Sequence, residues 1–116
     1  MTPFTIVKNT EIQTAALTAA GLRPGADQGN PQIAVKTLAP NASGNLGIWE
    51  CEPGGWPVTN RPDTEFCYIV SGRAKLTDDA SGQTIEVTTG DVVILPPGWT
   101  GRWDVSETVR KLYAIY

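Results

Sequence analysis

Glycine and proline recur every several residues along this 116-residue chain, and this punctuation most constrains what the chain can fold into. The 12 glycines and 9 prolines leave apolar segments that are too short for long helices and are separated by turn-forming residues. Such segments, at spacings of about 8–12 residues, are typical of a β-sandwich or β-barrel. We therefore expect an all-β fold, closed into a barrel because closure protects the edge strands.

The predicted strands are rich in β-branched and aromatic residues and end at turn-forming residues. The strongest prediction is Glu65–Val70, which we expect to end at Ser71–Gly72. Pro40–Asn45 is predicted to be a connector, and Asp78–Gly82 has the residues of a hairpin loop. The other predicted strands are Ile33–Leu38, Leu46–Cys51, Arg73–Thr77, Gln83–Thr88, Val92–Leu95, Trp99–Val105 and Val109–Tyr116.

One short helix is predicted near the N-terminus. Thr10 precedes Glu11–Gln13 in the arrangement of a capping box, and the alanine-rich segment Thr14–Ala20 follows until Gly21. We expect this helix to cover one end of the sheet. The length of the chain indicates a single domain, residues 1–116.

Charge and hydropathy exclude several classes of partner. Twelve acidic and nine basic side chains give a net charge of -3, and the basic residues are scattered, so we expect neither nucleic-acid nor membrane-surface binding. No window approaches the roughly 18 apolar residues of a membrane-spanning helix. Met1–Thr10 has one lysine and no apolar run, which is unlike a secretory signal or a transit peptide. We therefore expect a cytoplasmic protein.

The chain contains no histidine, which removes every mechanism that needs an imidazole base, a Cys–His pair or a histidine-bound metal. Its two cysteines, Cys51 and Cys67, lack the spacing of a redox or zinc motif. Reduced thiols are the default in a chain without an export signal. A disulfide between them would require neighbouring strands to bring them together.

Two segments match the consensus motifs of the cupin superfamily. Glu65 is followed by six residues and then Gly72, which fits the end of the first motif. Gly90–Gly98 fits the start of the second motif, with a glycine, five residues and a Pro-any-Gly turn. This resemblance implies a double-stranded β-helix, also called a jelly roll.

Further segments resemble one subgroup of small single-domain (RmlC-like) cupins, those grouped with (S)-ureidoglycine aminohydrolase. They are Gly47–Cys51, Glu65–Gly72 and Trp103–Lys111, and the motif-bearing region is 44–116. Residues 1–43 carry no motif and contribute the N-terminal helix and strands. The resemblance also implies a homodimer, and it leaves open whether the N-terminal strand crosses to the partner.

The chain departs from the metal-binding cupins at the ligand positions. Their paired histidines fall on Thr59 and Arg61, or on Val58 and Asn60 with the longer spacing. The histidine and asparagine of the second motif fall on Gly101 and Val105, so that Glu65 alone remains of four usual ligands. One carboxylate is too weak a metal site. We therefore expect no metal and no cofactor, and do not transfer ureidoglycine hydrolysis.

The motif register predicts that Glu65 and Cys67 face the barrel interior, because alternate residues of a strand share a face. A buried, unpaired Glu65 would serve as a general acid or base, whereas pairing with Arg61 or Arg102 would make it an inert ion-pair partner. Glu65 is alternatively a solvated turn residue. Cys67 is a candidate nucleophile or a packed apolar side chain.

Aromatic residues supply the remaining candidates for a binding site. Trp99 and Trp103 share a face with Gly101, which leaves a gap where relatives have a ligand. Trp56 is expected in a flexible loop, Gly54–Pro57, where it is predicted to be a lid over the barrel mouth or a dimer contact. Tyr113 faces the interior unless Leu112 and Ala114 do so instead. The predicted binding residues are Trp49, Trp56, Arg61, Trp99, Trp103 and Tyr113.

Three functions follow from these observations. The first is metal-free binding of a small organic molecule in the barrel lumen. The second is a metal-independent isomerase or hydrolase that uses Glu65 as acid or base, with Cys67 or Tyr113. The third is an interaction or scaffold protein whose barrel is filled by its own side chains. A lumenal cavity and the partners of Glu65 would discriminate among them.

Overall fold

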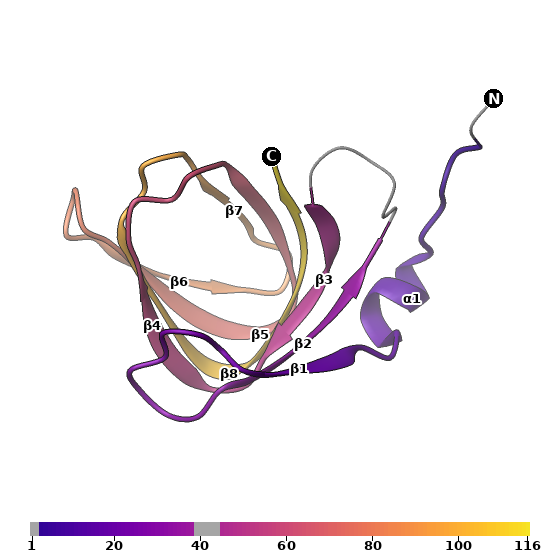
Figure 1. Cartoon of the computed structure of the whole chain (residues 1–116), viewed down its shortest axis with the longest axis horizontal. Helices are drawn as coiled ribbons and strands as arrows, with labels where there is room; N and C mark the ends of the chain where they lie inside the picture. The colour runs from indigo at the N-terminus through magenta and orange to yellow at the C-terminus, as the bar shows by residue number, and fades with distance from the viewer. Residues whose placement is uncertain (1–2, 39–44) are drawn as a thin grey trace.

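The computed structural model describes residues 3–38 and 45–116 (Figure 1), so most of the predicted connector Pro40–Asn45 lies outside the described residues. One short helix is followed by strands that form an antiparallel sheet, ordered β1-β2-β3-β8-β5-β6, with β4 paired to β8 and β7 paired to β5. The sheet curves into the predicted all-β jelly-roll barrel. The elements are α1 (Asn9–Thr14), β1 (Thr18–Leu22), β2 (Gln32–Thr37), β3 (Asn45–Cys51), β4 (Gly54–Val58), β5 (Glu65–Asp78), β6 (Thr84–Thr88), β7 (Val92–Leu95) and β8 (Gly101–Ile115).

Two long strands, β5 and β8, organise the barrel. Each pairs with the other along most of its length, while β8 also pairs with β3 and β4, and β5 with β6 and β7. The expected end of a strand at Ser71–Gly72 is wrong, because β5 continues through a series of register shifts between Ile69 and Ala74. The expected break between Val105 and Val109 is also wrong, because β8 runs through it.

Gly72 explains how β5 bends without ending. Its φ of +92° is strained for residues with a Cβ, and a Cβ there would overlap the carbonyl group of Thr108 on β8. Glycine therefore lets two strands approach closely at a bulge, and the strand continues beyond it. The predicted hairpin is confirmed, with Thr77 opposite Thr84 and a connection through residues 79–83, one residue beyond the predicted loop Asp78–Gly82.

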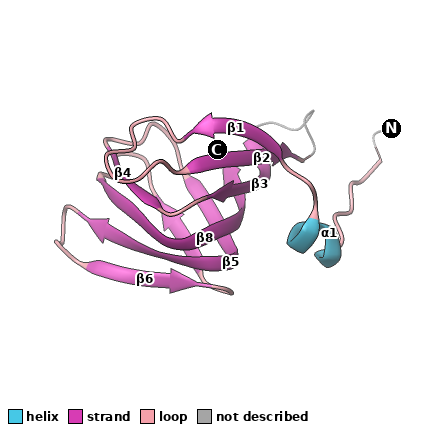
Figure 2. Cartoon of the chain, turned by 90° about the horizontal axis from the view of Figure 1, so that it is seen from below, coloured by secondary structure: helices cyan, strands magenta, loops and turns pink. Residues whose placement is uncertain are grey.

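The N-terminal segment differs from its prediction. The helix α1 begins one residue before Thr10 and ends at Thr14, and its N-cap residue Lys8 makes no side-chain capping hydrogen bond to the described residues. Part of the predicted helix, Thr18–Ala20, belongs to β1, which pairs with β2. Figures 1 and 2 show α1 outside the barrel, where the Arg110 guanidinium donates hydrogen bonds to the carbonyl oxygens of Ile12 and Ala15.

Apolar side chains from both halves of the sheet fill much of the barrel and form one core. The two cysteines lie in this core as free, fully buried thiols on different strands. Over residues 3–38 and 45–116, no helix has the length and apolar character needed to cross a membrane. The main cluster of this core consists of Cys51, Trp56, Cys67, Ile69, Ala74, Val87, Leu95, Trp103, Val105, Val109 and Tyr113.

Candidate functional site

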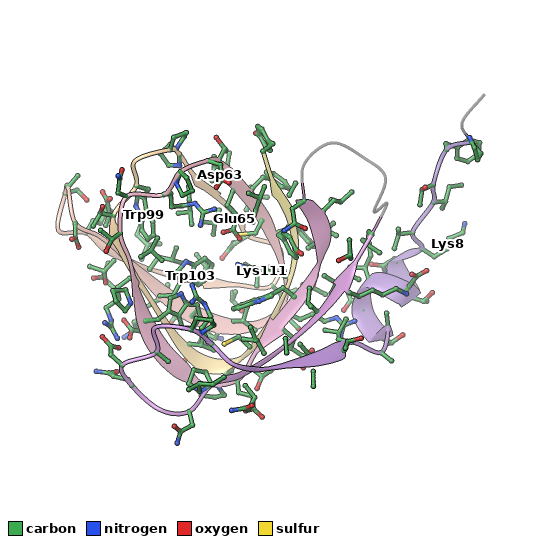
Figure 3. All side chains as sticks on the ribbon, viewed as in Figure 1. Lys8, Asp63, Glu65, Trp99, Trp103 and Lys111 are labelled. Atoms are coloured by element: carbon green, nitrogen blue, oxygen red, sulfur yellow. The ribbon has the colours of Figure 1, made fainter. Side chains whose placement is uncertain are left out.

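A cavity of about 330 Å³ lies inside the barrel, and we call it the lumen. Figure 3 shows that Glu65, Trp103 and Lys111 point into this interior from β5 and β8. The lining combines indole rings, a few aliphatic side chains and four charged groups. It consists of Arg23, Pro24, Ile33, Asn45, Trp49, Trp56, Val58, Arg61, Glu65, Trp103, Lys111, Tyr113 and Ile115.

A buried ion pair lies in the wall of the lumen. The Lys111 Nζ donates a hydrogen bond of 2.7 Å to Oε2 of Glu65, and both side chains are 8% exposed. The other carboxylate oxygen, Oε1, lies 3.2 Å from Nη1 of Arg61. Both oxygens of Glu65 therefore contact cations, and the carboxylate keeps these two positive groups in the lining of the lumen.

The alternation of β8 places Lys111 at this position. Trp103, Val109, Lys111 and Tyr113 occupy odd-numbered positions of one continuous strand and are buried on the same face. Lys111 is directly opposite Trp49 of β3, and its Nζ lies 4.4 Å from the centroid of that ring and 4.7 Å from that of Trp103. Cation–π attraction thus adds to the ion pair in holding the ammonium.

Stacked indoles form the apolar wall. Trp56 of β4 pairs with Trp103 of β8, and their rings stack at a centroid distance of 6.2 Å and an interplanar angle of 10°. Trp49 meets Trp56 edge-on at 5.9 Å. The expectation that Trp56 is part of a loop and a lid is wrong, because Gly54–Val58 is a strand and Trp56 is 2% exposed.

Two arginines complete the polar part of the lumen. Arg61 is held by Glu65 and by Asp63, whose Oδ1 lies 3.0 Å from Nη2. The buried Nε of Arg61 has no hydrogen-bond acceptor within residues 3–38 and 45–116. The Arg23 guanidinium stacks over Trp56 at 4.9 Å, and burial lowers its pKa. Among the described residues, Arg23 has no ion-pair partner.

Burial keeps the neutral groups of the site protonated. Desolvation raises the pKa of Cys67 to about 11, and it does the same for Cys51. Burial, and then the charge of Glu65, raises the pKa of Tyr113, whose hydroxyl is 3.2 Å from Oδ1 of Asn45. Gly47 makes room for this phenol, because a Cβ there would lie 2.8 Å from the Tyr113 hydroxyl.

The structure brings together most of the predicted site residues. Glu65 and the binding candidates Trp49, Trp56, Arg61, Trp103 and Tyr113 line the lumen, whereas Cys67 lies in the core outside the lining. Trp99 does not line the lumen. Its Nε1 donates to Oδ1 of Asp78 at 3.0 Å, and it lines a second, mostly apolar hollow. The gap expected at Gly101 is filled by this indole and the Thr77 carbonyl.

Sequence reasoning missed Lys111, Arg23 and Asn45. Lys111 carried a usable signal, because counting every second residue from Trp103 reaches it. The polar residues Ser106–Thr108 suggested a break between two strands. With that break, the alternation of faces could not be continued from Trp103 to Lys111. Arg23 and Asn45 carried no local signal, because the segment after β1 and the start of β3 meet the lumen only through the fold.

The residues at the site do not fit a metal ion. Both oxygens of Glu65 are paired with Lys111 and Arg61, and these cations would repel a divalent ion. Over the described parts of the chain, no three His, Cys, Asp or Glu side chains gather as potential ligands. The metal chemistry of other cupins therefore has no ligand set here.

Solved structures share the fold of the chain. A Pseudomonas syringae protein of unknown function from the DUF861 family aligns with a TM-score of 0.79 at 24% identity, over 90% of this chain and 46% of the other. A Salmonella typhimurium protein described as a putative ethanolamine utilization protein Q aligns with a TM-score of 0.67 at 21% identity, over 83% of this chain and 76% of the other. The polyketide cyclase RemF from Streptomyces resistomycificus aligns with a TM-score of 0.67 at 20% identity, over 97% of this chain and 80% of the other.

At these low identities the TM-scores show a shared fold alone, and the chain spans under half of the Pseudomonas protein. No curated protein matches the chain. Residues 38–113 match the EutQ-like cupin domain, a stretch that runs from the end of β2 to near the end of β8. With the β5 and β7 motifs in register inside one jelly roll, the chain belongs to the family of EutQ-like cupin domains.

Proposed function

We propose that this cupin domain binds a small organic molecule in its lumen without a metal ion. The observation that carries this proposal is the cavity of about 330 Å³, which lies within the range of small-molecule sites. Its walls have the composition of such sites, with mostly apolar rings and a few converging polar groups.

The indoles and the charged groups would contribute to binding in different ways. Trp49, Trp56 and Trp103 present large apolar surfaces that gain free energy when a ligand displaces water from them. The ion pair of Glu65 and Lys111 is already formed, so little ordering is needed when a ligand enters. This preorganisation favours a binding protein.

The two alternative functions have less support. A general acid or base needs a free carboxylate oxygen near the substrate, and both oxygens of Glu65 contact cations. A thiol whose pKa is raised to about 11 is a poor nucleophile, which weighs against Cys67. A filled barrel, as a scaffold would have, is at odds with the cavity. Ureidoglycine hydrolysis is not proposed, since the site lacks a ligand set for metal.

The test is a thermal-shift screen of the untagged protein against small amino acids, ureides, sugars and organic acids. We expect at least one compound to raise the melting temperature and to bind measurably by calorimetry. Val58→Phe, which narrows the lumen, should abolish that binding, while Val92→Phe on β7, which borders the second hollow and not the lumen, should preserve it. The proposal fails if no compound binds, or if both variants bind equally well.

The homodimer implied by the resemblance to small cupins is also part of the proposal. Light scattering coupled to gel filtration measures the mass directly. Twice the mass of the 12.4 kDa chain is expected, and a monomer at micromolar concentration would contradict it.

A further inference from the structure

We propose that the lumen recognises its ligand by a carboxylate, which Arg23 and Arg61 bind while the indoles hold the rest of the molecule. This inference rests on the proposed function, because it names the chemical class of the lumen's ligand. Four observations carry it: the charge balance of the lining, the state of Arg23, the orphaned atom of Arg61, and the position of Lys111.

The lining carries more positive than negative charge. Arg23, Arg61 and Lys111 face the lumen, and Glu65 is the one carboxylate in its lining among the residues that the structure describes. Asp63, which also contacts Arg61, offsets one further charge. One positive charge remains uncompensated, although the chain as a whole is net negative. An uncompensated charge in a partly desolvated cavity attracts an anion strongly.

Arg23 holds this excess charge. Its guanidinium is half-buried on the face of Trp56 and has no carboxylate partner among the described residues, while burial lowers its pKa. The side chain donates to the neighbouring Pro24 carbonyl, which is a neutral acceptor. A guanidinium presents parallel N–H groups that match the two oxygens of a carboxylate. Arg23 is therefore ready to bind an anion in a bidentate way.

Arg61 has capacity for a second contact. Its two Nη atoms are engaged by Asp63 and Glu65, but the buried Nε has no acceptor in the part of the chain that the structure describes. A buried N–H without a partner costs free energy, and a ligand oxygen beside this guanidinium would recover it. Lys111, by contrast, is already neutralised by Glu65 and stacked between two indoles. It therefore shapes the positive wall without requiring a new partner.

The size of the excess charge favours a carboxylate over a phosphate. One uncompensated charge is balanced by a monoanion, whereas a dianionic phosphate ester would leave negative charge in a partly desolvated cavity. The adjoining walls are indole rings from Trp49, Trp56 and Trp103, which suit an organic body of modest size. A small organic acid with an aromatic or aliphatic body meets both conditions.

Calorimetry with matched probes tests this inference. Benzoate, 3-phenylpropanoate and butanoate are each compared with the corresponding primary amide, and phenyl phosphate and inorganic phosphate serve as alternative anions. We expect at least one acid to bind tenfold or more tightly than its amide and more tightly than either phosphate. Arg23→Gln should weaken acid binding about tenfold without changing amide binding. Arg73→Gln, outside the lumen, is the matched control and should change neither.

The outcomes separate this inference from the proposed function. If amides or neutral compounds bind as well as the acids, or if Arg23→Gln leaves acid binding unchanged, the carboxylate inference is wrong and lumenal binding stands. Tighter binding of phenyl phosphate overturns the choice of carboxylate. If neither these probes nor any compound of the thermal-shift screen binds, the proposed function itself is wrong. Binding that survives in Val58→Phe would place the acid outside the lumen.

Discussion

Lys111 is an ammonium group buried beside indole rings, and such a charge is tolerated only with a partner. Glu65 supplies that partner and also contacts Arg61, so one carboxylate compensates two buried or nearly buried cations. The stability of the lumen wall therefore depends on one side chain more than on any exposed ion pair of the barrel.

Glu65→Gln should lower the free energy of unfolding by about 3–5 kcal/mol, because it leaves the buried Lys111 without its carboxylate and Arg61 with Asp63 alone. Urea denaturation followed by circular dichroism measures this loss. Glu86→Gln, which breaks an exposed pair with Arg73, is the control and should cost little. Adding Lys111→Met to Glu65→Gln should recover part of the loss. Equal losses of stability in Glu65→Gln and Glu86→Gln would refute this account of Glu65.

The buried thiols make stability fall at alkaline pH. Burial raises the pKa of Cys51 and Cys67 to about 11 in the folded protein, above the ordinary value of 9.0. The unfolded chain therefore releases these protons first as pH rises, so stability present below pH 9 is lost between about pH 9 and 11. The loss is on the order of 2 kcal/mol per thiol.

Urea denaturation at a series of pH values measures this loss. Cys67→Ala should flatten the decline by about half, compared with the unchanged chain. If the decline between about pH 9 and 11 is the same in both proteins, the thiols do not cause it.

Residue identity alone predicted part of the site. The motif register predicted that Glu65 and Trp103 face the barrel interior, and both line the lumen in the structure. The partners of Glu65, however, come from β8 and from the segment before β5. An ion pair across 46 positions in the chain leaves no local pattern. Cys67 remains a catalytic candidate only as a prediction from the sequence.

At the scale of elements, glycine geometry determines where the strands bend. Gly72 has a φ of +92° and faces the Thr108 carbonyl without room for a Cβ. Gly82, in the hairpin loop, has a φ of +70°, and a Cβ there would meet no atom of the described residues within 4 Å. The two glycines thus share the backbone strain but differ in packing.

Gly72→Ala should destabilise the protein by more than about 3 kcal/mol, because strain and overlap with β8 act together. Gly82→Ala should cost about 1 kcal/mol, since it meets strain alone. Urea midpoints of the two variants make the comparison. A Gly72→Ala protein as stable as Gly82→Ala would show that β5 and β8 can separate at the bulge at little cost.

Strand positions were predicted well where turns are chemically distinct. Val92–Leu95 and the hairpin after Thr77 match the structure, because proline and glycine mark their ends. Ser71–Gly72 resembles a turn, but in the structure it is a bulge within β5. Local sequence does not distinguish these two cases, because a neighbouring strand decides whether the chain continues.

The whole molecule is held together by pairing between distant segments. Strand β3 pairs with the end of β8, so Asn45 lies opposite Ile115, and Glu65 pairs with Ile115 from the other side. The punctuation of the sequence predicted a barrel of short strands, but it did not predict this order of strands, which depends on the closure of long loops. The family resemblance supplied the jelly-roll topology.

Folding should be slow for a chain of this length, because the entropy of closing long loops is lost before these distant pairings stabilise the chain. Stopped-flow refolding from urea, followed by circular dichroism, should give a main phase in the range of milliseconds to seconds. Completion within microseconds would show that local elements, rather than the pairing of β3 with β8, limit folding.

The stacked pair of Trp56 and Trp103 makes the lumen its own optical reporter. Two nearly parallel indoles at a centroid distance of 6.2 Å exchange excitation energy, and a third ring, Trp49, lies 5.9 Å from one of them. Any occupant that displaces water from these rings changes the surroundings of three of the four indole chromophores in the chain. Emission from the unlabelled protein therefore follows filling of the barrel as it happens.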